Sequence, residues 1–134
     1  MREIKFRAWL TLSERMIEEP FHFEVYHYSD ENRINQKAYR CYEDWRELED
    51  GRSSECVLLQ YTGIGDRNCK DIYEGDIIEV DWLDARYKVS KHLVEWDSIS
   101  CSFSFPGGSP YNDAVNYFTV IGNKFQNPEL IPTK

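Results

Sequence analysis

The stretch from Gln60 to Val80, QYTGIGDRNCKDIYEGDIIEV, carries the densest cluster of turn and strand signals in the chain. It continues the apolar run at residues 57–59, and Thr62-Gly63 then interrupts the strand pattern. Between residues 63 and 68 stand two glycines, an Asp and an Asn, which suit tight turns because they accept left-handed backbone angles or bond their own backbone. We therefore expect a strand, two successive reversals, and a resumed extended segment at residues 72–73.

A second strand is expected after the turn Glu74-Gly75-Asp76. Gly75 suits a backbone angle that is closed to residues with a Cβ atom, and the Asp76 carboxylate is placed to accept from a nearby amide. Residues 77–82 then alternate with period two. The side chains predicted to face the core are Ile78, Val80 and Trp82, and those predicted to face away are Ile77, Glu79 and Asp81.

Short strands separated by turn signals account for most of the remaining sequence. We expect strands at residues 4–9, from 16 onwards, and at 21–28, 87–97, 98–105 and 117–121, with turns at 11–14, 29–32, 84–86 and 127–130. Residues 4–9 predict a half-buried strand with Ile4, Phe6 and Ala8 on one face and Lys5, Arg7 and Trp9 on the other. Residues 98–105 show the cleanest alternation, which predicts one apolar face made of Ile99, Cys101, Phe103 and Phe105.

Residues 38–50 instead have a helical pattern. Tyr42, Trp45 and Leu48 recur at helical spacing between charged residues, and Gly51 is placed to end the helix. Such a stripe usually packs on its own domain, and a partner surface is the alternative. The predicted fold class is therefore mainly β with a short helix, arranged as a small barrel or roll.

Size and charge restrict the class of protein. The chain has 134 residues and a net charge of −8, with 16 basic against 24 acidic residues. This length suggests one domain, or one domain with a small appendage. No basic tail or patch is visible, so binding to nucleic acid is not favoured, and neither is binding to an anionic membrane. No apolar run approaches membrane-spanning length and no apolar signal segment begins the chain, so we expect a cytoplasmic protein with no membrane association.

Four cysteines, Cys41, Cys56, Cys69 and Cys101, are widely separated. No Cys-x-x-Cys pair occurs, and no His stands at ligand spacing, so a zinc site is not favoured. The count alone allows two disulfides. In the reducing cytoplasm expected for this chain, free thiols are the preferred interpretation.

Few residue patterns in the sequence are typical of a catalytic, metal-binding or phosphate-binding site. Asp66, Asp71, Asp76 and Asp81 recur every five residues, but as a calcium loop this stretch lacks the required glycine and the bidentate Glu. A catalytic carboxylate pair is an alternative, although Asp in turns more often bonds the backbone. His22, His27 and His92 are scattered and lie in no nucleophile motif, and the Gly-rich loop at 106–110 lacks the features of a phosphate loop. We expect neither an enzyme nor a cofactor.

Three separated blocks resemble the YopX family of small proteins encoded by bacteriophages and prophages. The central block is QYTG followed by Asp66, Asn68, Lys70 and IYEGDI; the N-terminal block is residues 2–9 with 15–17, and the C-terminal block is residues 120–123 with 127–130. Two residues depart from the family pattern, because Cys69 stands where a turn glycine is usual and Leu10 where an Asp commonly follows the Trp. The signature positions carried by this chain are Trp9, Gln60, Tyr61, Thr62, Gly63, Asp66, Asn68, Ile72, Tyr73, Glu74, Gly75, Asp76, Gly122, Asn123, Asn127 and Pro128.

The resemblance implies a fold and no established activity. It implies a single YopX-like domain over 1–134, with N-terminal strands at 1–59 that include a variable insertion at 20–56, and an SH3-like β-barrel over 60–134. We expect the residues at the signature positions to have mainly structural roles. Trp9 is interpreted as covering the barrel or the inserted segment, with a binding role as the alternative.

Binding is the function that remains. We expect a phage or prophage accessory protein that acts through contacts with a protein partner or with its own copies. The candidate interaction surface comprises Tyr61, Tyr73, Trp82, Tyr87 and Trp96. Two alternatives are an acidic decoy that mimics DNA, suggested by the net charge, and a small-barrel nucleic-acid binder that uses base stacking.

Overall fold

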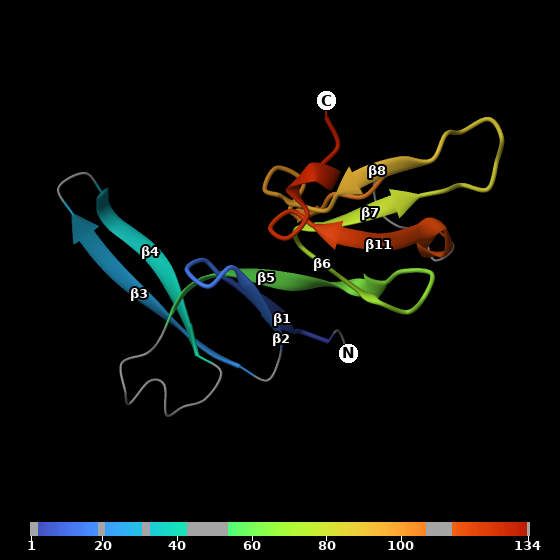
Figure 1. Cartoon of the computed structure of the whole chain (residues 1–134). Coiled ribbons are helices and arrows are strands. Elements are labelled where there is room, and N and C mark those ends of the chain that lie inside the picture. Colours follow the sequence, from blue (N-terminus) through green and yellow to red (C-terminus); the bar gives the residue numbers. More distant parts are fainter. Residues whose placement is uncertain (1–2, 19–20, 31–32, 43–53, 107–113, 134) are drawn as a thin grey trace. The chain divides into compact units, whose positions relative to one another are not determined.

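The computed structural model describes residues 3–18, 21–30, 33–42, 54–106 and 114–133 (Figure 1). The chain divides into two compact units, one of Lys5–Leu59 and one of Met1–Ile4 with Gln60–Lys134. Most of the helix expected at 38–50 and most of the Gly-rich loop at 106–110 lie outside the described residues. No helix in the described ranges is long and apolar enough to cross a membrane.

The unit Lys5–Leu59 is built on antiparallel strands in the order β2-β1-β5-β4-β3. β1 (Phe6–Leu10) pairs with β2 (Arg15–Glu18) through a turn at 11–14, as predicted. β3 (His22–Asp30) and β4 (Arg33–Tyr42) form a long hairpin, and β4 pairs with the start of β5 (Ser54–Gly65). The core cluster of this unit contains Ala8, Leu10, Ile17, Cys41 and Cys56.

The half-buried pattern predicted for residues 4–9 is wrong. Ile4 precedes the strand and is 70% exposed, whereas Arg7, Ala8, Trp9 and Leu10 are all buried. β1 lies between β2 and β5 in the sheet, and residues on both of its faces are excluded from water. The alternation of polar and apolar residues therefore did not identify a solvent-exposed face of this strand. Trp9 is buried, as expected.

Residues 38–42 are strand, so the predicted helix is wrong in the part that the structure describes. Within β4, Ala38 lies opposite Tyr26, and residues 39–41 lie opposite 23–25. The helical spacing was outweighed by antiparallel pairing with β3, a non-local interaction that a local pattern cannot report. The strand expected at 21–28 is present and extends to Asp30, so the loop expected at 29–32 begins later than predicted.

Cys41 and Cys56 form a disulfide, which corrects the expectation of free thiols at these two positions. The β4/β5 register places Tyr39 opposite Cys56 and Cys41 opposite Ser54, so the two cysteines are diagonal neighbours. Their Cα atoms are 5.9 Å apart, which lies within the range that a disulfide spans. The other two cysteines, Cys69 and Cys101, are free and exposed.

The described part of the C-terminal unit contains several short strands and two short 3-10 helices. These elements are β6 (Asp71–Tyr73), β7 (Asp76–Val80), β8 (Ser90–Leu93), β9 (Trp96–Asp97), β10 (Ser102–Phe103), η1 (Ala114–Tyr117), β11 (Phe118–Asn123) and η2 (Pro128–Leu130). β11, β7 and β8 form one antiparallel sheet (Figure 1), β9 and β10 form a second, and β6 pairs with the end of β5. The fold is mainly β, as predicted. Among the described strands these sheets are open, and the SH3-like barrel stays a prediction.

The core of this unit gathers around β7 and β11. Its buried members are Ile72, Ile78, Val80, Val94, Phe105 and Phe118. The rings of Phe105 and Phe118 stack with centroids 5.9 Å apart. Ile78 and Val80 face this core as predicted, but Ile77 is also fully buried, because β7 is the central strand between β11 and β8.

The strand predicted at residues 98–105 is wrong for its first half. Residues 98–101 form a turn in which Ile99 is 94% exposed and Cys101 has a φ of 52°. The Asp97 carboxylate accepts from the Ile99 amide at 2.9 Å and from the Ser100 hydroxyl at 2.8 Å, which favours a turn over an extended chain. The strand expected at 87–97 is likewise reduced to β8 and β9.

Candidate interaction site

Two of the five candidate surface aromatics, Tyr61 and Tyr73, are buried. They lie opposite each other in the β5/β6 register, and their ring centroids are 5.6 Å apart. Their exposed fractions are 9% and 8%. They contribute to internal packing, and we leave them out of the interaction site.

Trp96 is exposed, but it packs on a neighbouring strand and is not grouped with the other candidates. It is on β9, where its ring packs edge-on against Phe103 of β10 with centroids 5.2 Å apart. It does not line the pocket described next.

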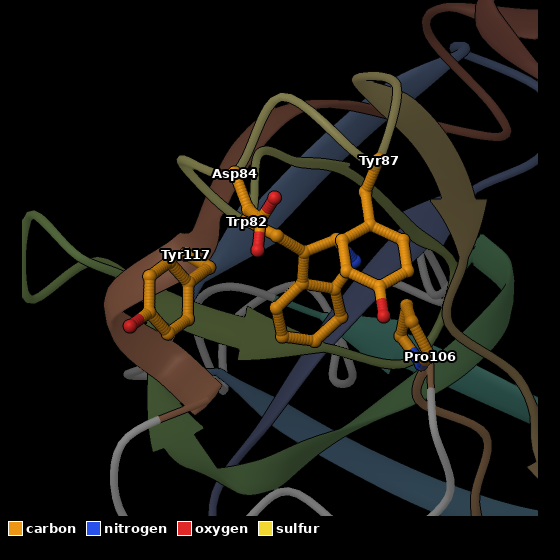
Figure 2. A pocket seen from close by; sticks show the side chains of 5 residues that line it. All are labelled: Trp82, Asp84, Tyr87, Pro106 and Tyr117. Atoms are coloured by element: carbon orange, nitrogen blue, oxygen red, sulfur yellow. The ribbon is translucent and has the colours of Figure 1, made fainter.

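Trp82 and Tyr87 line one pocket of about 560 Å³ together with Asp84, Pro106 and Tyr117 (Figure 2). We call this space the aromatic pocket. Trp82 follows β7, Asp84 and Tyr87 come from the β7–β8 loop, and Tyr117 ends η1. Sequence reasoning did not select Pro106 or Tyr117, because they are 19 or more positions from the loop in sequence. One sequence feature could have pointed to Tyr117: it stands next to Phe118 at the start of the last strand.

The Trp82 ring is held in place by two aromatic neighbours. Its centroid lies 5.5 Å from that of Tyr117 and 6.1 Å from that of Phe118, which is fully buried. The Asp81 amide also donates to the Tyr117 carbonyl at 3.0 Å, which fixes the end of β7 against η1. Aromatic pairs at these separations are typical of packed cores, so the floor of the pocket is preorganised.

The rim of the pocket carries an ion pair within a tight turn. The Asp84 carboxylate accepts from the Arg86 backbone amide at 2.9 Å and from Arg86 Nη2 at 2.6 Å, while Arg86 Nε lies 3.1 Å from both of its oxygens. These hydrogen bonds hold the pKa of Asp84 below its ordinary value and raise the pKa of Arg86. The Arg86 guanidinium also lies 5.8 Å from the Tyr87 ring centroid. Asp84 is therefore an ionised, already paired carboxylate and not a free base.

Asp66 is the centre of the first signature turn. Its Oδ1 accepts from the amides of Asn68 at 2.8 Å and Lys70 at 3.0 Å, and its Oδ2 accepts from the Val120 amide at 2.9 Å. Cys69, at the position where the family has glycine, has a φ of 61°. Asp66 thus has the turn role predicted for it, and it also ties that turn to β11.

The second signature turn lies between β6 and β7. Asp76 Oδ2 accepts from the Tyr73 amide at 2.8 Å, and Gly75 has a φ of 86°, as predicted. The Gly75 amide donates to the Val94 carbonyl at 2.7 Å, and the Val94 amide donates back to the Asp76 carbonyl at 2.8 Å. The Glu74 amide donates to the Gln60 carbonyl at 2.9 Å, which holds the end of β6 to β5.

Further signature residues make contacts of the same kind. The Thr62 hydroxyl donates to the Ile72 carbonyl at 2.7 Å, although β5 continues past the predicted break and Gly63, with a φ of 94°, lies inside it. Asn123 Oδ1 accepts from the Phe125 and Gln126 amides, and the Asn127 amide donates to the Asn123 carbonyl at 2.9 Å before Pro128 begins η2.

Other ionisable side chains form no assembled site within the described ranges. There is no group of three or more His, Cys, Asp or Glu side chains placed to hold a metal ion in that part of the chain. His92 Nε2 lies 3.0 Å from the Ser104 carbonyl oxygen, and His22 is exposed on β3. Burial raises the pKa of Glu74, which the nearby Lys124 ammonium partly offsets and the Glu95 carboxylate reinforces.

Comparisons with known proteins agree with this fold. The model of the YopX family, described as "YopX protein", matches residues 5–132. A crystal structure of protein EF1440 from Enterococcus faecalis is similar to the chain with a TM-score of 0.62 and 22% identity, over 98% of this chain and 100% of that one. At this identity the likeness concerns the fold alone. No curated protein matches the sequence.

Proposed function

This chain belongs to the YopX family, and we propose that it is a non-catalytic module that binds another protein through the aromatic pocket. We further propose that it is an accessory protein of a phage or prophage. The observation that carries the proposal is the pocket itself, which Trp82, Tyr87 and Tyr117 line together and whose floor is preorganised by the packing of Trp82 on Tyr117. Trp and Tyr in such settings are the side chains that most often dominate protein recognition.

The β7–β8 loop carries further exposed apolar side chains that do not line the pocket. Leu83 and Val89 are exposed large apolar side chains on the same loop as Tyr87, which is itself 59% exposed. Leu83 adopts a φ of 56°, and its amide donates to Asp81 Oδ1 at 2.9 Å. A loop that holds several apolar side chains in water, and holds one of them in an uncommon backbone region, favours a binding role over a connector role.

The two nucleic-acid alternatives have less support. An acidic DNA mimic needs its carboxylates on the surface, and two of the 24 acidic residues, Asp66 and Asp76, are instead buried and accept from backbone amides. A stacking site for single-stranded nucleic acid needs positive charge along the phosphates. The net charge of the chain is −8, and the Arg86 guanidinium on the pocket rim is paired with Asp84.

The cellular setting that we propose is the bacterial cytoplasm. The Cys41–Cys56 disulfide is the observation that weighs against this setting, because disulfides are rare in reducing compartments. Both half-cystines are buried, which limits attack by a soluble thiol. Alkylation of free thiols in intact cells before lysis, followed by mass spectrometry of the pair, tests the setting. A reduced pair supports the cytoplasm, and an oxidised pair contradicts it.

Affinity capture with matched variants tests the proposed function. Tagged wild-type protein, Tyr87→Ser and Ile99→Ser are each incubated with nuclease-treated bacterial lysate, and the protein's own mass is followed by light scattering. Ile99 is an exposed apolar residue outside the pocket lining, so its variant controls for general surface stickiness. We expect a partner, or a second copy, that is retained by wild type and Ile99→Ser and lost with Tyr87→Ser. Capture that is the same for all three baits contradicts the proposal.

A further inference from the structure

We propose that the aromatic pocket binds a proline-rich peptide segment in the polyproline II conformation, flanked by a basic residue. This inference rests on the protein-binding function proposed above and specifies the chemistry of the partner.

The lining of the pocket suits compact, rigid pyrrolidine rings. Trp82, Tyr87, Tyr117 and Pro106 present rings to one space of about 560 Å³ (Figure 2). Contacts with Tyr117 and Phe118 hold Trp82 in place, so little side-chain entropy remains to be lost on binding. A polyproline II segment is likewise ordered before it binds, and aromatic-lined grooves are the surfaces that recognise such segments.

Hydrogen-bonding capacity distinguishes this ligand from an ordinary peptide. Within the part of the chain that the structure describes, the Trp82 indole N–H and the Tyr87 and Tyr117 hydroxyls make no hydrogen bond. The Trp82 and Tyr87 donors lie beside the other lining rings, whereas the Tyr117 hydroxyl points away from them (Figure 2). A polyproline II segment has no internal hydrogen bonds and its prolines have no N–H, so its carbonyl oxygens are in excess over its donors. Donors in the pocket and acceptors on the ligand are complementary.

The state of the Asp84 carboxylate argues against a different occupant, a methylated ammonium group in an aromatic cage. Such a cation would gain from a free carboxylate beside the rings. Asp84 instead bonds both the backbone and the side chain of Arg86. The remaining attraction for positive charge comes from the chain as a whole, whose charge of −8 favours approach of a basic residue that flanks the proline-rich core.

A pair of peptide libraries tests the inference on the full chain. One library contains the pattern Pro-x-x-Pro, with an arginine at one end and random residues elsewhere. A polyproline II helix has three residues per turn, so the two prolines lie on the same edge. The second library replaces both prolines with alanine. Immobilised wild type, Tyr87→Ser and Ile99→Ser are exposed to each library, and the retained peptides are then titrated by fluorescence anisotropy.

We expect wild type and Ile99→Ser to retain the proline library preferentially. We expect affinity for the retained peptides to fall about tenfold or more with Tyr87→Ser, as is typical when an aromatic anchor is truncated. Because Tyr87 is largely exposed, this variant should keep its fold, which far-ultraviolet circular dichroism checks. Equal retention of both libraries overturns the inference, and so does retention that is unchanged in Tyr87→Ser.

Competition separates this inference from the proposed function. If the cellular partner depends on Tyr87 and is displaced by the retained peptide, both hold. If it depends on Tyr87 but is not displaced, the protein-binding function holds and the proline-rich ligand is wrong. If a fluorescent oligothymidylate at low salt binds wild type and not Tyr87→Ser, the pocket stacks bases and both proposals fail.

Discussion

The Asp66 carboxylate accepts a hydrogen bond from the Val120 amide at 2.9 Å across 54 positions of sequence. Its other oxygen accepts from two amides of its own turn, those of Asn68 and Lys70. One buried side chain therefore satisfies three backbone donors and joins the turn after β5 to the last strand. This gives a physical reason for an Asp in the signature at this position, independent of any chemistry at a site.

Replacing Asp66 with alanine should destabilise the fold. Three amides lose their acceptor, and we expect the free energy of unfolding to fall by about 2–4 kcal/mol in urea denaturation, since hydrogen bonds to a charged group each contribute about 1.5–3 kcal/mol before relaxation and water entry. The exposed carboxylate variant Glu129→Ala is the control, with an expected change within about 0.5 kcal/mol. Equal effects of the two substitutions would contradict the role assigned to Asp66.

Gly122 should tolerate no side chain. A Cβ atom at this position would lie 2.5 Å from Asn127 Oδ1 and 2.8 Å from its Cγ. Asn127 would have to move away from the Asn123 amide, which donates to it at 3.3 Å. We expect Gly122→Ala to lower the free energy of unfolding by about 1–3 kcal/mol, the range for overpacking.

Gly65→Ala is the matched control for this substitution, because the nearest atoms to its Cβ are 3.4 Å away. The double variant Gly122→Ala/Asn127→Ala should be less destabilised than the sum of the single variants, since it removes the clashing side chain. Strict additivity would show that the clash is relieved in some other way.

Replacing Cys69 with glycine should stabilise the fold. Its φ of 61° lies in the left-handed region, which is costly for a residue with a Cβ atom by about 1–2 kcal/mol. Glycine removes that strain but gives the unfolded chain more freedom, worth about 0.5–1 kcal/mol. We therefore expect Cys69→Gly to raise the free energy of unfolding by up to about 1 kcal/mol, and Cys69→Ala to give no such gain.

Sequence reasoning succeeded where the determining chemistry is local. The turns at Asp66, Gly75 and Asp84 were predictable because their side chains bond amides two to four positions away or adopt backbone angles specific to the residue type. It failed where partners are distant in sequence. The strand at 38–42 depends on pairing with β3, and the disulfide depends on the β4/β5 register.

The candidate site shows the same division. Trp82 and Tyr87 were named from sequence among five candidate surface aromatics, although the alternation of residues 77–82 also placed Trp82 on the core side, and Trp82 is half-buried against that core. Tyr61 and Tyr73 looked equivalent, but their opposition across β5 and β6 buries them. Pro106 and Tyr117 complete the pocket from a later part of the chain, and no local pattern could assign them to it.

Removing the Cys41–Cys56 disulfide should destabilise the protein. The closed loop spans 15 residues, for which the chain-entropy estimate is about 3 kcal/mol. We expect the variant Cys41→Ala/Cys56→Ala to lose about 2–4 kcal/mol in denaturant unfolding, and wild type in excess dithiothreitol to approach the variant. Cys101→Ala, which removes an exposed free thiol, is the control for the effect of the reductant. Two alkylatable thiols at positions 41 and 56 in air-oxidised protein would contradict the pairing.

Glu74 should make stability depend on pH. Burial raises its pKa above the ordinary value of 4.5, so the folded chain holds this proton more tightly than the unfolded chain does. The stabilising contribution is therefore fully present below about pH 4.5 and is lost as pH rises through the folded-state pKa. Glu74→Gln keeps the side chain uncharged, so we expect it to be more stable than wild type at pH 7 and the difference to shrink towards pH 4.

Glu95→Gln is the matched variant for the electrostatic part of this effect. The Glu95 carboxylate reinforces the rise in the pKa of Glu74, so its removal should reduce the advantage of Glu74→Gln at pH 7 without abolishing it, because burial is the larger cause. Urea denaturation of the four combinations at pH 4 and pH 7 measures both differences. An advantage of the same size at both pH values would show that the substitution acts through packing, and the protonation of Glu74 would then have no part in it.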